Sequence, residues 1–268
     1  TPTLSSAASD VYKRQLHNGK LPNQSELDGL ISKLKANRNL PDGIIDFLKN
    51  APKDAGPMDV IRTGVSMMGL YDTKGDHQNR SLNEDRAIAI IAKIPLIVAA
   101  FHRFRQGLEI VESREDLSEA AHFLYLINGE VPSKDAAKTL DVAYILHADH
   151  GMNASTFSSR VTVATLSDMY SAITSAIGTL KGPLHGGANE GVIQMLEEIG
   201  AEDAVDAYVE GKLERKEKIM GIGHRVYKVL DPRAPHLRKM AIKLTEELGD
   251  PKWINMSERI AEMMKDRK

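Results

Sequence analysis

The stretch that organises the rest of the chain is residues 180–190, LKGPLHGGANE. A helical pattern of apolar residues runs into Gly182 and Pro183 and must stop there, because proline lacks an N–H and clashes with the preceding helical turn. A second helical pattern begins near Ala188 and ends at Gly200. His185 is therefore predicted to lie in a glycine-lined turn directly before the N-terminus of a helix.

This predicted position of His185 suits a hydrogen-bond donor. Glycines allow a ligand or another stretch of backbone to come close, and the helix dipole disfavours a positive charge on the imidazole ring. A neutral histidine can donate a hydrogen bond to a carbonyl oxygen that becomes an enolate. The alternative is a turn between helices that carries a surface histidine, and this stretch alone leaves both interpretations open.

The composition is that of an ordinary globular protein. The 268 residues are 42% hydrophobic and 27% charged, and the formal net charge is −2. This balance gives no reason to expect a nucleic acid or a membrane surface as partner, and no uninterrupted apolar run reaches the roughly 18 residues of a membrane span. The absence of cysteine excludes disulfides, thiol catalysis and zinc sites built from cysteine.

Helical periodicity dominates the chain, and no clean alternating run indicates a sheet, so the predicted fold class is all-α. Pro95 predicts a kink or break in the helix it interrupts. Asn-Gly pairs at 18–19 and 128–129 resemble helix C-caps.

Residues 1–15 lack a convincing helical or alternating period and are expected to form an N-terminal segment outside the fold. The main predicted helices cover 25–37, 42–48, 57–70, 81–106, 117–127, 133–149 and 153–180.

Residues 146–153, LHADHGMN, form a second cluster. His147 and His150 are three residues apart and would share a helix face. With Asp149 they could bind a metal ion, as in a metal-dependent hydrolase. The alternative is a helix C-terminus, where histidine is favoured near the negative end of the dipole.

A third cluster lies at residues 219–233, IMGIGHRVYKVLDPR. A dinucleotide fingerprint fails here, because position 226 is valine and a charged helical stretch precedes the glycines. The cluster instead contains a segment with two glycines, which is followed by a histidine. It ends in an Asp-Pro-Arg sequence, in which Arg233 could bind a carboxylate through two hydrogen bonds.

Together these three motifs, in this order, resemble the citrate synthase family, which includes 2-methylcitrate synthase, in its short bacterial or archaeal form. The resemblance covers the chain from about Leu16 to its end. It implies an all-α fold with a large helical domain over residues 16–187 and a small helical domain over residues 188–268. It also implies a homodimer, which we expect to be cytoplasmic.

The resemblance further implies an activity, which is the condensation of acetyl-CoA with oxaloacetate to give citrate and CoA. The catalytic residues would be His185, which stabilises the enol of the thioester, and His224, which polarises the ketone. Oxaloacetate would be bound by His150, Asn153 and Arg233. The CoA contact would be formed by Met220, Gly221, Ile222 and Gly223. No metal and no cofactor is implied, since the CoA thioester is a substrate.

One departure concerns the catalytic base. The family's aspartate lies in a motif that this chain does not contain before it ends at Lys268. We therefore expect the chain to be an internal fragment that does not turn over its substrates by itself. The choice between acetyl-CoA and propionyl-CoA, and so between citrate synthase and 2-methylcitrate synthase, stays open, because one methylene is worth only about 1–3 kcal/mol of discrimination.

Overall fold

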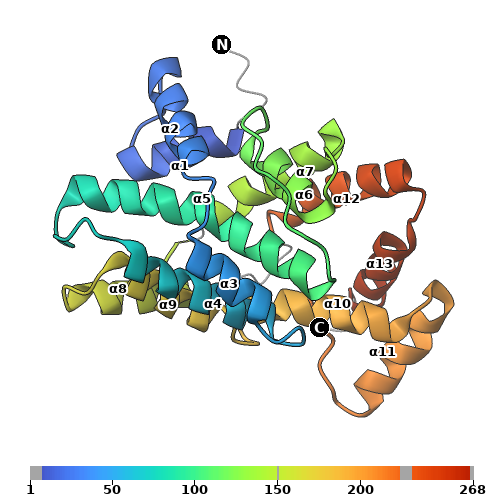
Figure 1. The fold of residues 1–268 in the computed structure, drawn as a ribbon. Helices are drawn as coiled ribbons and strands as arrows, with labels where there is room; N and C mark the ends of the chain where they lie inside the picture. The colour runs from blue at the N-terminus through green and yellow to red at the C-terminus, as the bar shows by residue number, and fades with distance from the viewer. Residues whose placement is uncertain (1–7, 150, 224–230, 266–268) are drawn as a thin grey trace. The chain divides into compact units, whose positions relative to one another are not determined.

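The computed structural model describes residues 8–149, 151–223 and 231–265, and these residues contain helices and no strand (Figure 1). The predicted all-α class is therefore confirmed. The chain divides into two compact units, Thr1–Leu180 (unit 1) and Lys181–Lys268 (unit 2). A functional division at residues 187 and 188 stays a prediction.

Unit 1 contains nine α-helices in its described residues. They are α1 (Ala8–Asn18), α2 (Gln24–Ala36), α3 (Asp42–Asn50), α4 (Pro57–Met68), α5 (Arg80–Arg105), α6 (Glu119–Asn128), α7 (Lys134–Ala148), α8 (Ala154–Ala164) and α9 (Met169–Leu180). The described part of unit 2 contains α10 (Gly187–Ile199), α11 (Val205–Glu214), α12 (Ala234–Leu248) and α13 (Lys252–Met264).

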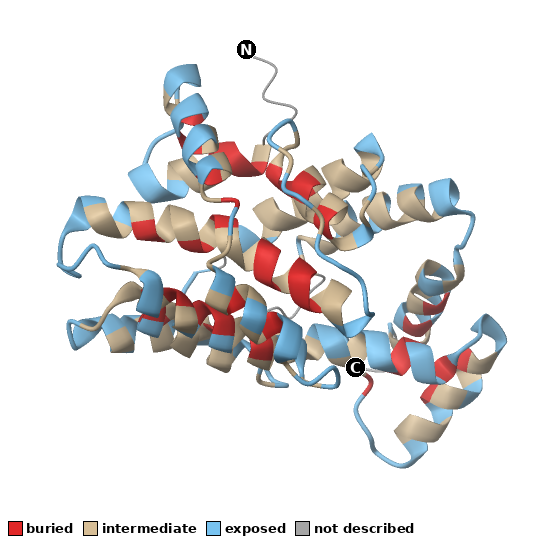
Figure 2. Cartoon of the chain, in the orientation of Figure 1, coloured by how far each residue is buried: buried red, intermediate tan, exposed pale blue. Residues whose placement is uncertain are grey.

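The core of unit 1 is built around α5. Figure 2 shows buried positions along α3, α4 and α5. Ile97 and Phe101 of α5 pack in one apolar cluster with residues of α3, α4 and α9. Gly64 of α4 allows this approach, because a Cβ at that position would lie only 3.1 Å from a methyl carbon of Ile97. Among the described residues, α5 is the one helix long and apolar enough to cross a membrane. It packs against α3 and α4, as a helix in the core of a folded domain does.

Of the predicted kink or break at Pro95, the break is absent, because α5 runs without interruption from Arg80 to Arg105; a kink stays a prediction. A proline removes one N–H from the helical ladder and strains the preceding turn. Leu96 and Ile97, which follow it directly, are both buried. Their packing against neighbouring helices stabilises the helical path across the proline.

The single long helix predicted over residues 153–180 is also wrong, because the chain turns back and forms a hairpin of α8 and α9. Leu166 takes a left-handed conformation in the turn, with φ 62°. The carboxylate of Asp168 then accepts a hydrogen bond from the backbone N–H of Ser171 at 2.9 Å and starts α9. Small residues let the two helices approach closely, and the Ser155 hydroxyl donates to the Ala176 carbonyl at 2.9 Å.

Both Asn-Gly caps are confirmed. Gly19 has φ 72° and donates its N–H to the Gln15 carbonyl at 2.7 Å. Gly129 has φ 81° and donates to the Tyr125 carbonyl at 2.7 Å. Only glycine adopts this backbone conformation without a steric penalty.

Residues 8–15 differ from the expectation of a lead outside the fold, because they belong to α1, which packs against α7. Val11 of α1 is buried. The Asp141 carboxylate of α7 accepts a hydrogen bond from the backbone N–H of Ser9 at 3.1 Å. A side chain 132 residues away thus caps the first turn of α1, which no local sequence pattern could indicate.

Unit 2 has its own apolar core. Met195, Leu196 and Ile199 of α10 pack with buried residues of α11 and α13, among them Val209 and Met256. This cluster supports the turn before α10 and the segment that follows α11, both of which carry residues singled out above.

Candidate active site

The turn that carries His185 is tightly closed. The Gly182 carbonyl accepts hydrogen bonds from the N–H groups of His185 at 2.9 Å and of Gly187 at 3.2 Å. A Cβ on Gly187 would lie 2.6 Å from the Lys181 carbonyl oxygen and 3.0 Å from that of Gly182. Because both contacts are with backbone, no side chain fits at position 187. The half-buried His185 lies two residues before α10, as the sequence predicts.

The segment predicted to contact CoA follows the buried Ile219. Ile222 donates its N–H to the Ile219 carbonyl at 3.4 Å, which closes a turn. Gly221 and Gly223 both have positive φ, at 79° and 84°. Residues 221–223 are exposed, so this is a turn whose backbone a ligand can approach. His224, the next residue, lies outside the described residues.

Arg233 stands at the start of α12 and is held by Asp231. Its Nη2 and Nε donate to the Asp231 carboxylate at 2.7 and 3.0 Å, and its backbone N–H donates to the same carboxylate at 2.9 Å. The aspartate thus fixes the plane of the guanidinium. The two-pronged hydrogen bonding predicted for a substrate carboxylate is made here with the Asp231 carboxylate.

The cluster at residues 146–153 contains the end of helix α7 and the residue that caps helix α8. The His147 ring Nδ1 lies 2.7 Å from the Ala143 carbonyl oxygen, and the Asp149 carboxylate accepts from the Gly151 N–H at 3.1 Å. Asn153 caps α8, because its side-chain oxygen accepts from the Thr156 N–H at 3.0 Å. His150 lies outside the described residues, among which no group of three metal-ligating side chains is found.

The structure therefore places three of the sequence-predicted elements in unit 2. These are the His185 turn, the Met220–Gly223 segment and Arg233, while Asn153 belongs to unit 1. The His185 turn and the Met220–Gly223 segment both contact α10. The His185 carbonyl accepts a hydrogen bond from the Ala188 N–H of α10, and Met220 and Gly221 lie against Gly191 and Val192.

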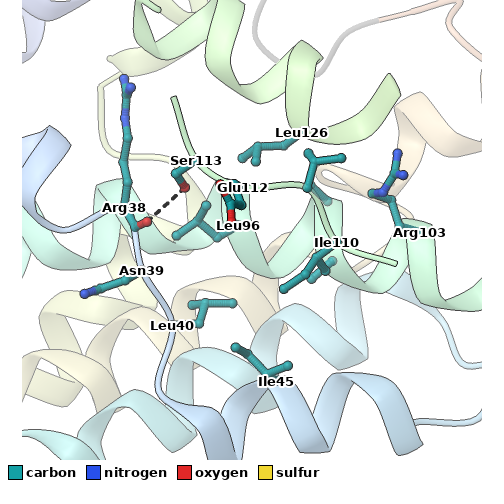
Figure 3. Close-up of a pocket in the computed structure, with 13 residues that line it drawn as sticks. Arg38, Asn39, Leu40, Ile45, Leu96, Arg103, Ile110, Glu112, Ser113 and Leu126 are labelled. Carbon is teal, nitrogen blue, oxygen red and sulfur yellow. Dashed lines mark hydrogen bonds between the residues drawn. The ribbon is translucent and has the colours of Figure 1, made fainter. Parts of the chain in front are cut away.

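Two features of unit 1 are not predicted by any sequence motif. One is a cavity of about 230 Å³ with Leu40, Ile45, Leu96, Ile110 and Leu126 in its mostly apolar wall (Figure 3). Beside it lies a buried ion pair in which the Arg38 guanidinium binds Glu119 at 2.5 Å. The residues of both features come from separate helices and loops, so no motif or period marks them.

Comparison with known proteins supports one family over nearly the whole chain. A family model described as the citrate synthase C-terminal domain matches residues 6–268. Citrate synthase 2 of Bacillus subtilis is 51% identical over 250 residues, which are 93% of this chain and 67% of the relative. The 2-methylcitrate synthase of Shewanella oneidensis is 42% identical over 93% of this chain and 66% of its own.

The structural comparison agrees. A Thermoplasma acidophilum citrate synthase, solved as a ternary complex with carboxymethyl coenzyme A and oxaloacetate, superposes with a TM-score of 0.89. It is 30% identical, and the match covers 95% of this chain and 67% of that one. The fold and these matches define an all-α acyltransferase. The chain belongs to the citrate synthase family, and it spans about 67% of the length of the Bacillus relative.

Proposed function

We propose that the chain carries out the substrate binding and carbonyl activation of a citrate synthase reaction, in which acetyl-CoA condenses with oxaloacetate. The observation that carries this proposal is the closed Gly182–Gly187 turn, which presents His185 at the N-terminus of α10. It gains support from the Thermoplasma relative, whose structure was solved with a CoA analogue and oxaloacetate. The family assignment also favours acyl transfer over a metal-dependent hydrolase.

The two histidines are assigned to the two oxygens on which negative charge develops during the reaction. A carboxylate base removes a proton from the acetyl methyl group, and the electrons move onto the thioester oxygen. A hydrogen bond from His185 stabilises the resulting enolate oxygen. The enolate carbon then forms a bond to the ketone carbon of oxaloacetate, and His224 stabilises the negative charge that develops on the ketone oxygen until that oxygen takes up a proton. Hydrolysis of the citryl thioester by water releases citrate and CoA.

Substrate binding is assigned to the remaining predicted residues. Oxaloacetate is dianionic, so Arg233, His150 and the Asn153 amide are assigned to its oxygens. The backbone of residues Met220–Gly223, which includes the exposed turn at residues 221–223, is assigned to CoA. Propionyl-CoA is the second candidate acyl donor, because 2-methylcitrate synthases are among the relatives.

Turnover can be tested in a hybrid enzyme. This chain would replace the matching 67% of Bacillus subtilis citrate synthase 2, and oxaloacetate-dependent release of CoA thiol would be followed with acetyl-CoA and with propionyl-CoA. His185→Ala and His224→Ala should each lower turnover at least about 100-fold, as expected for loss of a preorganised donor. The exposed His17→Ala is the matched control and should be neutral. Near-normal turnover in either active-site variant would remove that histidine from the mechanism.

Oxaloacetate binding can be tested on the chain itself by calorimetry. Arg233→Lys should weaken binding, because an ammonium group cannot reproduce the planar guanidinium fork. Arg215→Lys, on an exposed pair with Glu217, is the control. Equal oxaloacetate affinity in Arg233→Lys and in the unsubstituted chain would exclude Arg233 from the site.

We also propose a homodimer that uses the outer face of α8. Phe157 and Val161 are four residues apart on this helix and are 60% and 53% exposed. An exposed apolar stripe of this kind is typical of a surface that another protein covers. Phe157→Glu should shift the sedimenting species from dimer to monomer, whereas a monomeric unsubstituted chain would refute the assignment.

A further inference from the structure

The side chain of Met220 lies across helix α10 at Gly191. A Cβ built on Gly191 would come within 2.6 Å of the Met220 terminal methyl and within 3.5 Å of its Cγ. Met220 is half-buried and packs against the unit 2 core together with Val192. The glycine therefore leaves a notch on α10 that the flexible thioether side chain fills.

The next residue makes a second contact with the same helix. Gly221 has φ 79°, and a Cβ built on it would lie 3.0 Å from a methyl carbon of Val192. Two consecutive residues of the segment thus rest on two consecutive residues of α10. The exposed turn at residues 221–223 begins directly after this anchor.

Helix α10 connects this anchor to the His185 turn. The Ala188 N–H donates to the His185 carbonyl at 3.1 Å, and the helix then continues to Gly191 and Val192. At about 1.5 Å of rise per residue, the anchor lies within two turns of the helix start. A helical turn is stiff, so the separation between His185 and the anchored segment is set by α10.

We propose that Met220 is a positioning residue, which holds the acyl-CoA-contacting turn at residues 221–223 in register with His185 by docking into the Gly191 notch of α10. This inference rests on the proposed function. Met220 itself acts through its side chain on the backbone that follows it. The thioester oxygen and His185 must meet at hydrogen-bond distance, so a loosened turn costs acyl-CoA affinity.

A core-filling role would have different consequences. Loss of a half-buried side chain from the core lowers the stability of unit 2 wherever that side chain lies. A positioning role changes the order of residues 221–223 and the affinity for CoA, and leaves oxaloacetate affinity unchanged. Met263 of α13 separates the two roles, because it is also a half-buried methionine packed on the same cluster.

The experiment compares Met220→Ala, Met220→Leu and Met263→Ala with the unsubstituted chain. Amide hydrogen exchange would be followed in peptides that cover residues 219–223, and affinities for coenzyme A and for oxaloacetate would be measured by calorimetry. Thermal unfolding would record any loss of stability. Leucine conserves the volume of methionine, so it tests rescue by the conservative variant.

Met220→Ala should exchange faster at residues 219–223 and bind CoA at least about tenfold more weakly. Met220→Leu should restore the exchange rate and the CoA affinity of the unsubstituted chain. Met263→Ala should lower the unfolding temperature without changing that exchange rate or that affinity. Equal exchange and CoA affinity in Met220→Ala and the unsubstituted chain would overturn the positioning role alone. An unsubstituted chain that fails to bind CoA would instead overturn the proposed function.

Discussion

At the scale of single residues, the buried Arg38 of unit 1 is held by hydrogen bonds from all three of its guanidinium nitrogens. Its guanidinium binds the Glu119 carboxylate at 2.5 Å and the carbonyl oxygens of Arg114 and Leu117 at 2.5 and 3.0 Å. His122 is 2% exposed and belongs to the same surroundings. Burial and the nearby Arg38 charge lower the pKa of His122 to about 4, although Glu119 acts in the opposite direction.

This lowered pKa predicts a pH-dependent stability. The unfolded chain binds a proton at His122 near pH 6.5, whereas the folded chain binds it only near pH 4. The free energy of unfolding is therefore unaffected by this histidine above pH 6.5 and falls as the pH drops from 6.5 toward 4. The total loss is about 3 kcal/mol. Urea unfolding at several pH values should show a steeper loss in the unsubstituted chain than in His122→Gln. Parallel stability curves for the two proteins would contradict the assignment.

At the scale of secondary structure, residues 153–180 show which feature the periodicity does not predict. The pattern correctly predicts helix, since α8 and α9 are both helices, but it does not predict the turn at Leu166 between them. A left-handed leucine is not a recognised turn signal, whereas the Asn-Gly caps are. The hairpin is favoured because small side chains such as Ser155 let α8 and α9 pack along their length.

Helix α1 offers a test at the same scale. Asp141→Ala removes the side-chain acceptor of the Ser9 N–H, so we expect the free energy of unfolding to fall by about 1–2 kcal/mol, as for other helix caps. The loss should appear as faster amide exchange in α1. Asp46→Ala, at an exposed position of α3, is the matched control and should leave α1 unchanged. Unchanged exchange in α1 of the Asp141 variant would refute the capping role.

At the scale of the whole molecule, the two units have separate apolar clusters. The largest cluster of unit 1 draws on α3, α4, α5 and α9, and that of unit 2 draws on α10, α11 and α13. Residues of one cluster do not occur in the other. Each unit can therefore lose its own packing as a cooperative step.

The single tryptophan, Trp253, belongs to α13 of unit 2. A small unit buries a lower fraction of its surface and is less stable. We therefore expect Trp253 fluorescence to change at a lower urea concentration than far-UV circular dichroism, which is dominated by the helices of unit 1. Coincident transitions would show that the chain unfolds as one cooperative body.

The sequence by itself determined the all-α class, the Asn-Gly caps and the turn that places His185 before α10. These features depend on residues within a few positions of one another, where periodicity and backbone preferences act directly. Only the tertiary structure decided the α8–α9 hairpin, the inclusion of α1, the ion pair between Arg38 and Glu119, and the docking of Met220 on α10. Arg38 and Glu119 are 81 positions apart, and Ser9 and Asp141 are 132 apart. Contacts over such separations form only when several helices pack together, and no local pattern encodes which residues will then meet.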